Sequence, residues 1–331
     1  MIYTVTLNPS LDRVIWVDEL KTDDSVRIIN EKHYAGGKGI DASRVIKALG
    51  GDTTASGFLG SFNGMELEGL LINEGVHCDF VKIAAETRSN VIVFTNKSNE
   101  HISFNSSGPE ITPYDLALLF NKIKTLSSKP DFVLLSGSLP KNVNENVYAQ
   151  LIHLLKCQGI KVALDSDNQP LKEGVKEKPF MIKPNSHEFT RLVGRVCQSD
   201  AEILQAGQTF IKAGIEVIMV SMGAKGLLVF NKYEAYRLTP PRIEVKSTIG
   251  SGDSTLAAFV HGLKIGKNIA DAAIMGTAAG AATAMSPGVE LVNFNDYMNL
   301  LPQVVCEPVS LEEISHANDG INDLMLQHAP L

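Results

Sequence analysis

The sequence predicts an α/β fold in which helices cover both faces of a mostly parallel sheet. Three observations support this fold class. Short aliphatic and β-branched runs alternate with segments of helical periodicity along the chain. The 331 residues, 44% of them hydrophobic, can bury one large core. Neither an internal repeat nor a long polar linker divides the sequence. We therefore expect one core with an insertion and not two independent domains.

The strands of the core are predicted by apolar runs at 2–7, 53–59, 131–136, 160–165, 179–183 and 216–221, followed by a hairpin at 226–231 and 234–238. Apolar residues at helical spacing within 42–49 and 116–123 predict helices that cover this sheet.

Three segments interrupt the α/β pattern with strict alternation, as in Val14/Trp16 and Val26/Ile28. Segments 12–18, 26–34 and 90–105 are therefore expected to form half-exposed strands of a small β-sheet lid. The predicted division of the chain is an α/β core of 1–11, 36–88 and 107–308, a lid of 12–35 and 89–106, and a C-terminal tail of 309–331.

The net charge of −7 argues against a nucleic-acid or anionic-membrane partner, because neither polyanion is attracted by the average field. The sequence lacks a secretory signal pattern and any apolar run of about eighteen residues, so we expect a cytoplasmic protein. Its four cysteines are widely spaced, which predicts reduced, mostly buried thiols: Cys78, Cys157, Cys197 and Cys306.

The strongest functional signal is a small-residue turn, Gly250, Ser251 and Gly252, at the start of a predicted helix. Backbone amides at such a turn bind a phosphoryl group, helped by the positive end of the helix dipole. Asp253 follows directly, where a carboxylate can accept the proton of an attacking alcohol. The alternative is a plain helix cap after a glycine turn.

A second glycine-rich turn contains Gly36, Gly37 and Lys38 and leads to Asp41. It matches neither the P-loop nor the dinucleotide-binding pattern. Its glycines let a substrate approach the backbone and Lys38 supplies a cation, although an ordinary turn with an exposed lysine remains an alternative.

Two further clusters follow predicted strands. Asn185 and Glu188, one helical turn apart after Lys183, suit hydrated Mg²⁺ as hard ligands, or else form a capping box. A small-residue turn at a strand's carboxyl end, where open α/β sheets bind ligands, contains Ser221, Gly223 and Gly226.

Asp12 and Arg88 complete the candidate set. Asp12 can hydrogen-bond sugar hydroxyls, and Arg88 can bind a phosphate with two parallel hydrogen bonds. Taken alone, each residue is more often a simple surface charge.

In this order the motifs resemble the ribokinase-like carbohydrate kinases of the PfkB family, from residue 1 to about residue 290. GGKGID at 36–41 and STIGSGDSTLAAF at 247–259 look like the two family signatures. The hexose-phosphate branch is resembled by TLNPSLD at 6–12, TRSN at 87–90, SGSLP at 136–140, KPNSHE at 183–188 and SMGAKG at 221–226.

The resemblance implies a ribokinase-like fold and an ATP- and Mg²⁺-dependent kinase, acting on fructose-1-phosphate in the first place. Tagatose-6-phosphate, fructose-6-phosphate or a nucleoside are alternative acceptors. Asp253 is then the base, with Gly250, Ser251 and Gly252 as the anion hole. The sugar phosphate is held by Asp12, Gly36, Gly37, Lys38, Asp41, Arg88 and Ser138; the nucleotide cleft is lined by Lys183, Asn185, Ser221, Gly223 and Gly226; and Asn185 and Glu188 lie near Mg²⁺.

The resemblance also implies a homodimer formed through the lid. One departure stands out, because the family usually has Asn where this chain has Asp41, and a carboxylate cannot donate the amide hydrogen bond. Two other classes compete with the kinase: a non-catalytic sensor of sugar phosphate, and a dehydrogenase, which the absence of a glycine-rich turn after the first strand disfavours.

Overall fold

The structure is a computed structural model that describes residues 1–311 apart from 22, 98–99 and 127. Its main sheet contains β1 (Ile2–Thr6), β4 (Thr53–Gly60), β5 (His77–Cys78), β6 (Val81–Ile83), β9 (Phe132–Ser136), β10 (Lys161–Asp165), β11 (Met181–Ile182), β12 (Val217–Ser221), β13 (Leu227–Phe230), β14 (Ala235–Thr239) and β15 (Val305–Pro308). A second, small sheet contains β2 (Ser10–Val17), β3 (Asn30–Gly36), β7 (Arg88–Thr95) and β8 (Glu100–Phe104).

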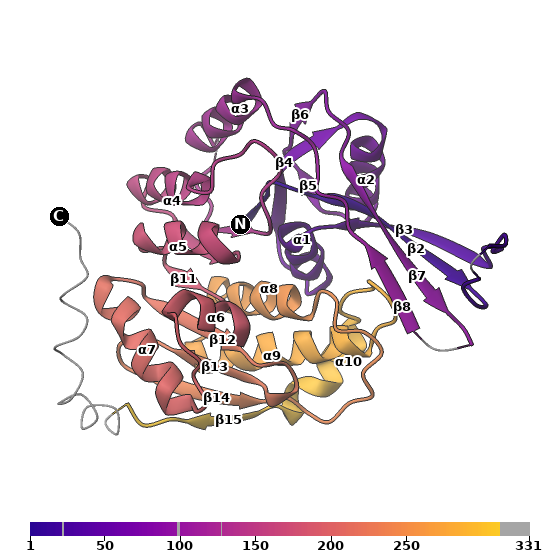
Figure 1. The fold of residues 1–331 in the computed structure, drawn as a ribbon. Helices are drawn as coiled ribbons and strands as arrows, with labels where there is room; N and C mark the ends of the chain where they lie inside the picture. Colours follow the sequence, from indigo (N-terminus) through magenta and orange to yellow (C-terminus); the bar gives the residue numbers. More distant parts are fainter. Residues whose placement is uncertain (22, 98–99, 127, 312–331) are drawn as a thin grey trace.

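The helices are α1 (Lys38–Ala48), α2 (Ser61–Asn73), α3 (Pro113–Lys124), α4 (Val147–Cys157), α5 (Asn168–Lys176), α6 (Ser186–Val193), α7 (Asp200–Ala213), α8 (Ser251–Lys264), α9 (Ile269–Met285) and α10 (Phe294–Leu300). Figure 1 shows them on both sides of the main sheet. No helix in the described part of the chain is long and apolar enough to cross a membrane.

The main sheet has the order β15-β14-β13-β12-β11-β10-β9-β1-β4-β5, with β6 beside β4. Neighbouring strands from β12 to β5 run parallel, and the strands from β13 to β15 extend the sheet as antiparallel neighbours. The predicted mostly parallel sheet and the predicted hairpin are confirmed.

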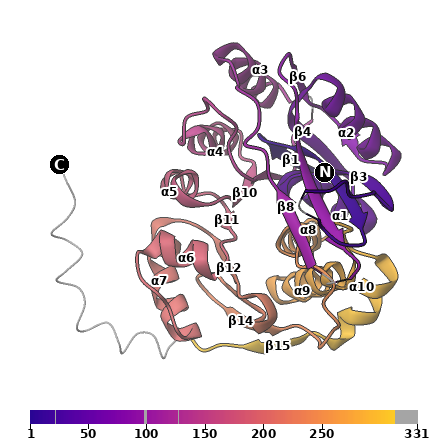
Figure 2. The same ribbon diagram turned by 45° about the vertical axis from the view of Figure 1, so that its right-hand side comes forward.

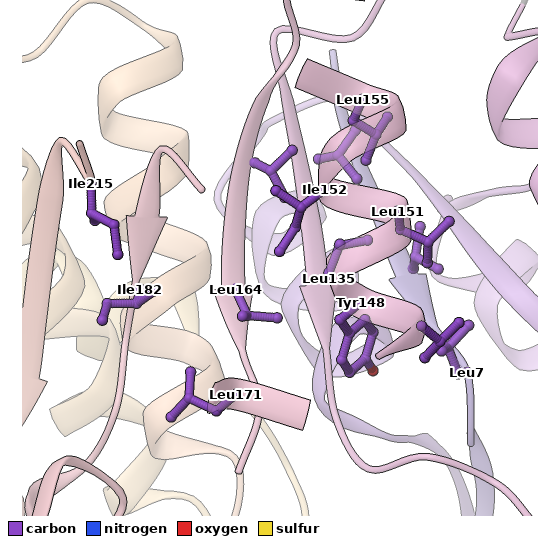
Figure 3. Packing of buried hydrophobic residues seen from close by; sticks show 14 of the residues in the cluster. Leu7, Leu135, Tyr148, Leu151, Ile152, Leu155, Leu164, Leu171, Ile182 and Ile215 are labelled. Atoms are coloured by element: carbon purple, nitrogen blue, oxygen red, sulfur yellow. The ribbon is translucent and has the colours of Figure 1, made fainter. Parts of the chain in front are cut away.

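Alternating residues of the strands supply two separate cores, because successive side chains of a strand point to opposite faces. Tyr3 and Val5 of β1 pack with α4 residues such as Leu151 and Ile152, whereas Ile2 belongs to a cluster with α1, α8 and α9. Figure 3 shows the first core, where one face of α4 lies against the sheet.

The small sheet has the order β3-β2-β7-β8 and stands beside the carboxyl-end side of the main sheet (Figures 1 and 2). A second small sheet is thus confirmed, while the division of the chain into core, lid and tail stays a prediction. Residues 312–331 of the predicted tail lie outside the described residues.

Three sequence predictions need correction. The helix expected at 42–49 begins at Lys38, because Gly37 already serves as its N-cap. Val26 and Ile28 precede the strand, which begins at Asn30. The four cysteines are free thiols as expected, but none is buried, and Cys157 is exposed.

Candidate active site

The candidate site lies where the parallel strands end. β1, β9, β10, β11 and β12 are consecutive neighbours, so the residues that follow them meet at one edge of the sheet. Ser138 follows β9, Asp165 is the last residue of β10, Lys183 follows β11 and Ser221 ends β12. The predicted motifs at these positions are therefore brought together by strand order.

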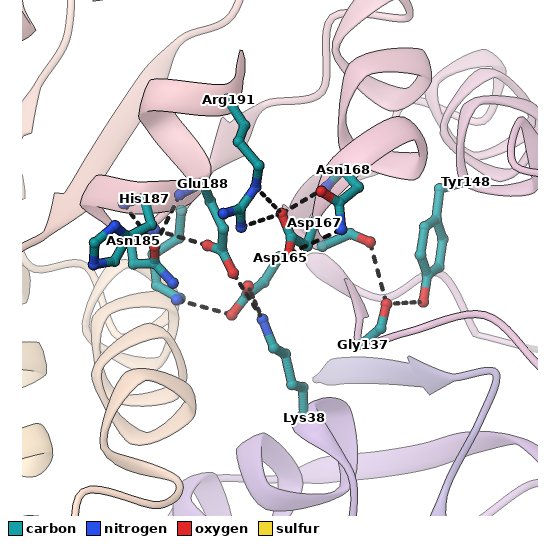
Figure 4. Close-up of polar contacts among 12 residues, drawn as sticks. Lys38, Gly137, Tyr148, Asp165, Asp167, Asn168, Asn185, His187, Glu188 and Arg191 are labelled. Atoms are coloured by element: carbon teal, nitrogen blue, oxygen red, sulfur yellow. Dashed lines mark hydrogen bonds and ion pairs between the residues drawn. The ribbon is translucent and has the colours of Figure 1, made fainter. Parts of the chain in front are cut away.

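Asp165 is the centre of this edge. Its buried carboxylate contacts Lys38 Nζ through Oδ1 at 2.8 Å and Lys183 Nζ through Oδ2 at 2.9 Å (Figure 4). Burial raises the pKa of Asp165, but the charges of Lys183 and Lys38 outweigh it and hold that pKa below its ordinary value. The carboxylate is thus ionised and fixes two cations.

Lys38 is the first residue of α1 and reaches a second carboxylate, with Nζ at 3.7 Å from Glu188 Oε1. Burial lowers the pKa of Lys38, whereas the charges of Asp165, Asp253 and Glu188 raise it above its ordinary value. Lys38 therefore stays protonated, and it lies among three acidic groups.

The turn before α8 exposes backbone donors. Gly250 is left-handed with φ 76°, a conformation that glycine adopts without strain, and Ser251 begins the helix. The amides of Ser251 and Ser254 donate to Thr248 O and Gly250 O. The amides of Gly252 and Asp253 are at positions that lack an intrahelical partner, and Ser251 Oγ is buried without a hydrogen bond.

Lys183 connects this turn to the carboxylate cluster. Its Nζ lies 3.5 Å from the position that a Cβ on Gly252 would occupy, and the side chain is only 4% exposed. The Lys183 ammonium group is therefore a neighbour of the helix N-terminus, and the two together favour an anion there.

Asp253 lies in the first turn of α8 and is partly accessible to solvent. Burial and the Asp165 carboxylate raise the pKa of Asp253 to about 7, although Lys38 and Lys183 act in the opposite direction. A carboxyl group with a pKa near neutrality is suited to exchange a proton during a reaction.

A second polar group comes from the small sheet. Asn90 Nδ2 donates to Asp12 Oδ1 at 2.8 Å, and Ser10 Oγ donates to the same oxygen at 2.7 Å. Gly36 lies against this carboxylate, since a Cβ there would be 2.2 Å from Asp12 Oδ2. Asn8, just before Ser10 on the chain, connects this group to the loop after β9, because its Nδ2 donates to Ser138 Oγ at 3.3 Å.

Arg88 contacts the same segment, with Nε donating to Asn8 O at 3.1 Å. The Arg88 charge also lowers the pKa of Asp12, against the larger effect of burial, which raises it. The predicted cation and the predicted hydroxyl acceptor are thus electrostatic neighbours.

Asp41 lies on α1, near the carboxyl groups of Asp12 and Asp253. Burial, followed by the Asp253 charge, raises the pKa of Asp41 well above its usual range. The guanidinium of Arg44 opposes this effect, with Nη1 at 3.7 Å from Asp41 Oδ1. Asp41 therefore belongs to an acidic group with Asp12 and Asp253, backed by one arginine.

Asn185 and Glu188 form a complete capping box. Asn185 Oδ1 accepts from the amides of His187 and Glu188, and Glu188 Oε2 accepts from the amide of Asn185. Both lone pairs of the Asn185 oxygen are thereby used, so Glu188 Oε1 is the oxygen of this pair that faces the lysine cluster. A direct metal contact of Asn185 stays a prediction.

The predicted nucleotide turn adjoins this box, since Ser221 bridges to Asn185 and its amide donates to Pro184 O. Gly223 is exposed, and a Cβ on Gly226 would be 2.0 Å from Leu238 O. The turn thus lies farther along the same edge, beside Asn185 and Pro184.

Sequence reasoning missed Asp165, Asn90 and Asn8 as site residues. Asp165 had a usable signal, because it is the one charged residue at the carboxyl end of the predicted strand 160–165. Asn8 and Asn90 stood inside quoted motifs but had no obvious partner in the sequence.

Comparison with known proteins places this geometry in a family. The model of the pfkB family carbohydrate kinases matches residues 5–293. The chain belongs to this family. It is 36% identical over 310 residues to the 1-phosphofructokinase of Borreliella burgdorferi, covering 93% of this chain and 99% of the relative.

Two further similarities cover most of the chain. The D-tagatose-1-phosphate kinase of Bacillus licheniformis is 33% identical over 87% of this chain and 94% of its own length. The structure of phosphofructokinase-2 from Escherichia coli in complex with potassium superimposes with a TM-score of 0.87 at 28% identity, covering 91% of this chain and 98% of that one. The sequence-based family assignment is confirmed.

Because the Asp165 carboxylate pairs with two lysines, we expect its replacement to lower the stability of the protein strongly. Asp165→Asn should lower the free energy of unfolding by about 3–5 kcal/mol, since it leaves two lysines without their anion in a buried place. Urea unfolding at pH 7 measures this difference.

Asp167→Asn is the matched control, because Asp167 pairs with Arg191 at the surface and Asn caps a helix as well as Asp does. It should cost about 1 kcal/mol at most. Equal losses in the two variants would show that the Asp165 pairs add nothing beyond an exposed ion pair.

Proposed function

We propose that this carbohydrate kinase transfers the γ-phosphoryl group of ATP to a hydroxyl of a ketohexose phosphate, with fructose-1-phosphate as the preferred acceptor. One observation carries the proposal. Asp253, with a pKa raised to about 7, lies in the first turn of α8, where the helix amides lack intrahelical partners, and within the field of Lys38 and Lys183. A base and an anion pocket in contact are what phosphoryl transfer to an alcohol requires.

The donor side fits a nucleotide with Mg²⁺. The amides of Gly252 and Asp253 and the Lys183 ammonium group supply positive partners for the phosphoryl oxygens. Bound Mg²⁺ would neutralise the charge that develops on the phosphates. Glu188 Oε1 is the proposed carboxylate for its hydration shell, and the turn of Ser221, Gly223 and Gly226 is the proposed place of the nucleoside.

The acceptor side fits a phosphorylated sugar. Asp12, Asp41 and the Asn90 amide offer acceptors and donors for hydroxyl groups, while Arg88 and Ser138 lie beside the end of β1, where they suit a phosphate. The two relatives described above are named for substrates that carry their phosphate on carbon 1. This shared feature supports fructose-1-phosphate over the 6-phosphates as the acceptor.

The transfer follows from these positions. Ionised Asp253 accepts the proton of the attacking hydroxyl as the new P–O bond forms, while the bond between the γ-phosphorus and the β,γ-bridging oxygen breaks and ADP leaves. The α8 amides bind the phosphoryl oxygens while Lys38 and Lys183, held by Asp165, compensate their charge. The small sheet that carries Asp12 excludes water, which would otherwise compete as acceptor.

We also propose that two chains associate through the small sheet. Its edge strand β8 exposes Ile102 by 43% and Phe104 by 59%. Within the described residues, β3 and β8 are the outer strands of this sheet, and edge strands with exposed apolar residues are suited to pairing with another copy. A monomeric mass in light scattering at micromolar concentration would contradict this association.

Asp253→Asn tests the base directly. The amide cannot accept the proton, so kcat should fall by about 10²–10⁴-fold, while ATP binding changes little. A coupled assay of ADP release measures kcat, and calorimetric titration measures ATP binding. Unchanged turnover would remove Asp253 from the mechanism. Tight binding of both ligands by the wild-type chain without ADP formation would favour a sensor instead.

The raised pKa of Asp253 predicts the pH dependence. Because the reaction needs the ionised carboxylate, kcat/KM should be constant above a pH of about 7 and fall about tenfold per unit of pH below it. Asp165→Asn removes the negative charge that helps to raise this pKa. The pH below which kcat/KM falls should therefore be lower in this variant than in the wild-type protein. A limb near pH 4 in the wild-type protein would contradict the assigned environment.

A panel of acceptors tests the substrate. Fructose-1-phosphate, tagatose-1-phosphate, their 6-phosphates and a nucleoside are compared by kcat/KM, and the 1-phosphates should exceed the others by at least about tenfold. Asp41→Asn should change the ratio between fructose-1-phosphate and tagatose-1-phosphate, since the amide always donates and carries no charge, whereas a carboxyl group donates only when it is protonated. An unchanged ranking would mean that Asp41 does not read the acceptor.

A further inference from the structure

Two residues of β3 in the small sheet contact the carboxylate of Glu290, which lies outside that sheet. Tyr34 Oη donates to Glu290 Oε1 at 3.0 Å, and Lys32 Nζ lies 3.1 Å from the same oxygen. Glu290 follows α9, in the segment that leads to α10. Strand β3 is therefore attached to a segment 258 residues away in the sequence.

These residues stand on the face of the small sheet that carries the proposed sugar contact. In the antiparallel pair, Asp12 is opposite Tyr34 and Val14 is opposite Lys32. Residues directly opposite one another project to the same side of a sheet. The attachment to Glu290 thus acts on the face that bears Asp12.

An apolar contact accompanies the polar one. Val289, next to Glu290, is buried in a cluster with Val14 of β2 and Ile92 of β7, and Ile249 packs against this cluster. Ile249 directly precedes Gly250, the start of the turn that opens α8. The small sheet, the segment of Glu290 and the proposed anion pocket are therefore packed together.

Tyr34 is connected to the acidic group as well. The Arg44 guanidinium lies 5.9 Å from the centre of the Tyr34 ring, and its Nη1 donates to Ala35 O at 3.1 Å. Arg44 is also the cation beside Asp41. A displacement of β3 would thus alter the position of Arg44 beside Asp41, on the proposed acceptor side. Through the cluster with Ile249 it would also alter the packing of the turn before α8, on the proposed donor side.

We propose that Glu290 is a positioning residue for phosphoryl transfer, which holds β3 and the Asp12 strand over the α8 turn through Lys32 and Tyr34. This inference rests on the proposed kinase function. Glu290 makes none of the proposed substrate contacts, and it acts through the placement of the sheet that closes the site.

We expect Glu290 to tolerate substitution. The Glu290 side chain is 38% exposed, and β3 keeps a separate contact on its other face, where His33 Nδ1 lies 2.5 Å from Glu66 Oε1 of α2. Loss of the Glu290 contacts should therefore loosen the small sheet without unfolding the protein.

The test compares Glu290→Ala, Glu290→Gln, Tyr34→Phe and the double variant of Glu290→Ala with Tyr34→Phe in steady-state kinetics. In Glu290→Ala the KM for the sugar phosphate should rise about 5- to 30-fold, as expected for a lost charge-assisted hydrogen bond. ATP hydrolysis without sugar should rise severalfold relative to transfer, because water reaches a loosened site. Glu290→Gln should be intermediate, since it keeps an acceptor for Tyr34.

Tyr34→Phe should add little to Glu290→Ala, because both remove the same interaction. Glu216→Ala, at an exposed glutamate that directly precedes β12 and so lies at the edge of the main sheet opposite the site, is the control and should leave both quantities unchanged. The melting temperature of the Glu290 variants should move by about 2 °C at most. A fall in kcat and melting temperature together, with unchanged KM and hydrolysis ratio, would indicate a merely structural role and overturn the proposal.

Failure of the kinase function gives a different result from failure of this inference. An active wild-type kinase with unaltered Glu290→Ala kinetics overturns the inference alone. If the wild-type chain forms no ADP with any acceptor, amide hydrogen exchange can still test whether Glu290 holds β3 in place. Faster exchange of the amides of residues 30–36 in Glu290→Ala supports the attachment, and unchanged exchange overturns it.

Discussion

The ion pairs of Asp165 with Lys38 and Lys183 are the interaction on which the rest of the site depends. Lys38 begins α1 and Lys183 follows β11, so one carboxylate at the end of β10 joins three separate parts of the chain. The same negative charge helps to raise the pKa of Asp253. Placement of the cations and strength of the proposed base therefore have one physical cause, and neither can be altered alone.

The proposed anion site lies at the start of a helix, α8, that is buried on most of its surface. Residues 254–262 of the helix have little exposed surface, and they pack against α1 and α9. The first-turn amides thus point in a fixed direction before any ligand arrives. Donors that need no rearrangement stabilise a developing charge more effectively than mobile ones. The small sheet, in contrast, is held beside the site by few contacts, with Val289 and with the partly exposed Glu290.

Parts of the fold with a local sequence signal could be predicted. The continuous aliphatic runs of β1, β9, β10 and β12 identified their strands within a residue or two. The start of α1 was missed because Gly37 and Gly39 disfavour a helix on local grounds, and only packing against β1 overrides them. Asp165 and Glu290 were missed for a related reason. Their partners lie up to 127 and 258 residues away, and nothing in the neighbouring sequence marks such pairs.

The charge distribution suggests how a sugar phosphate is oriented. Asp12, Asp41 and Asp253 form an acidic group, and Arg44 beside Asp41 is buried, with 10% of its side chain exposed. An acidic surface accepts hydrogen bonds from hydroxyls and repels a phosphate. Arg88, beside Asn8, offers the opposite field at one end of this group. A substrate with one phosphate and several hydroxyls is thus favoured in the orientation that directs a hydroxyl toward Asp253. On the proposed function, Asp41 adds a further partner for hydroxyl groups, and Arg44 opposes the rise of the Asp41 pKa that burial causes.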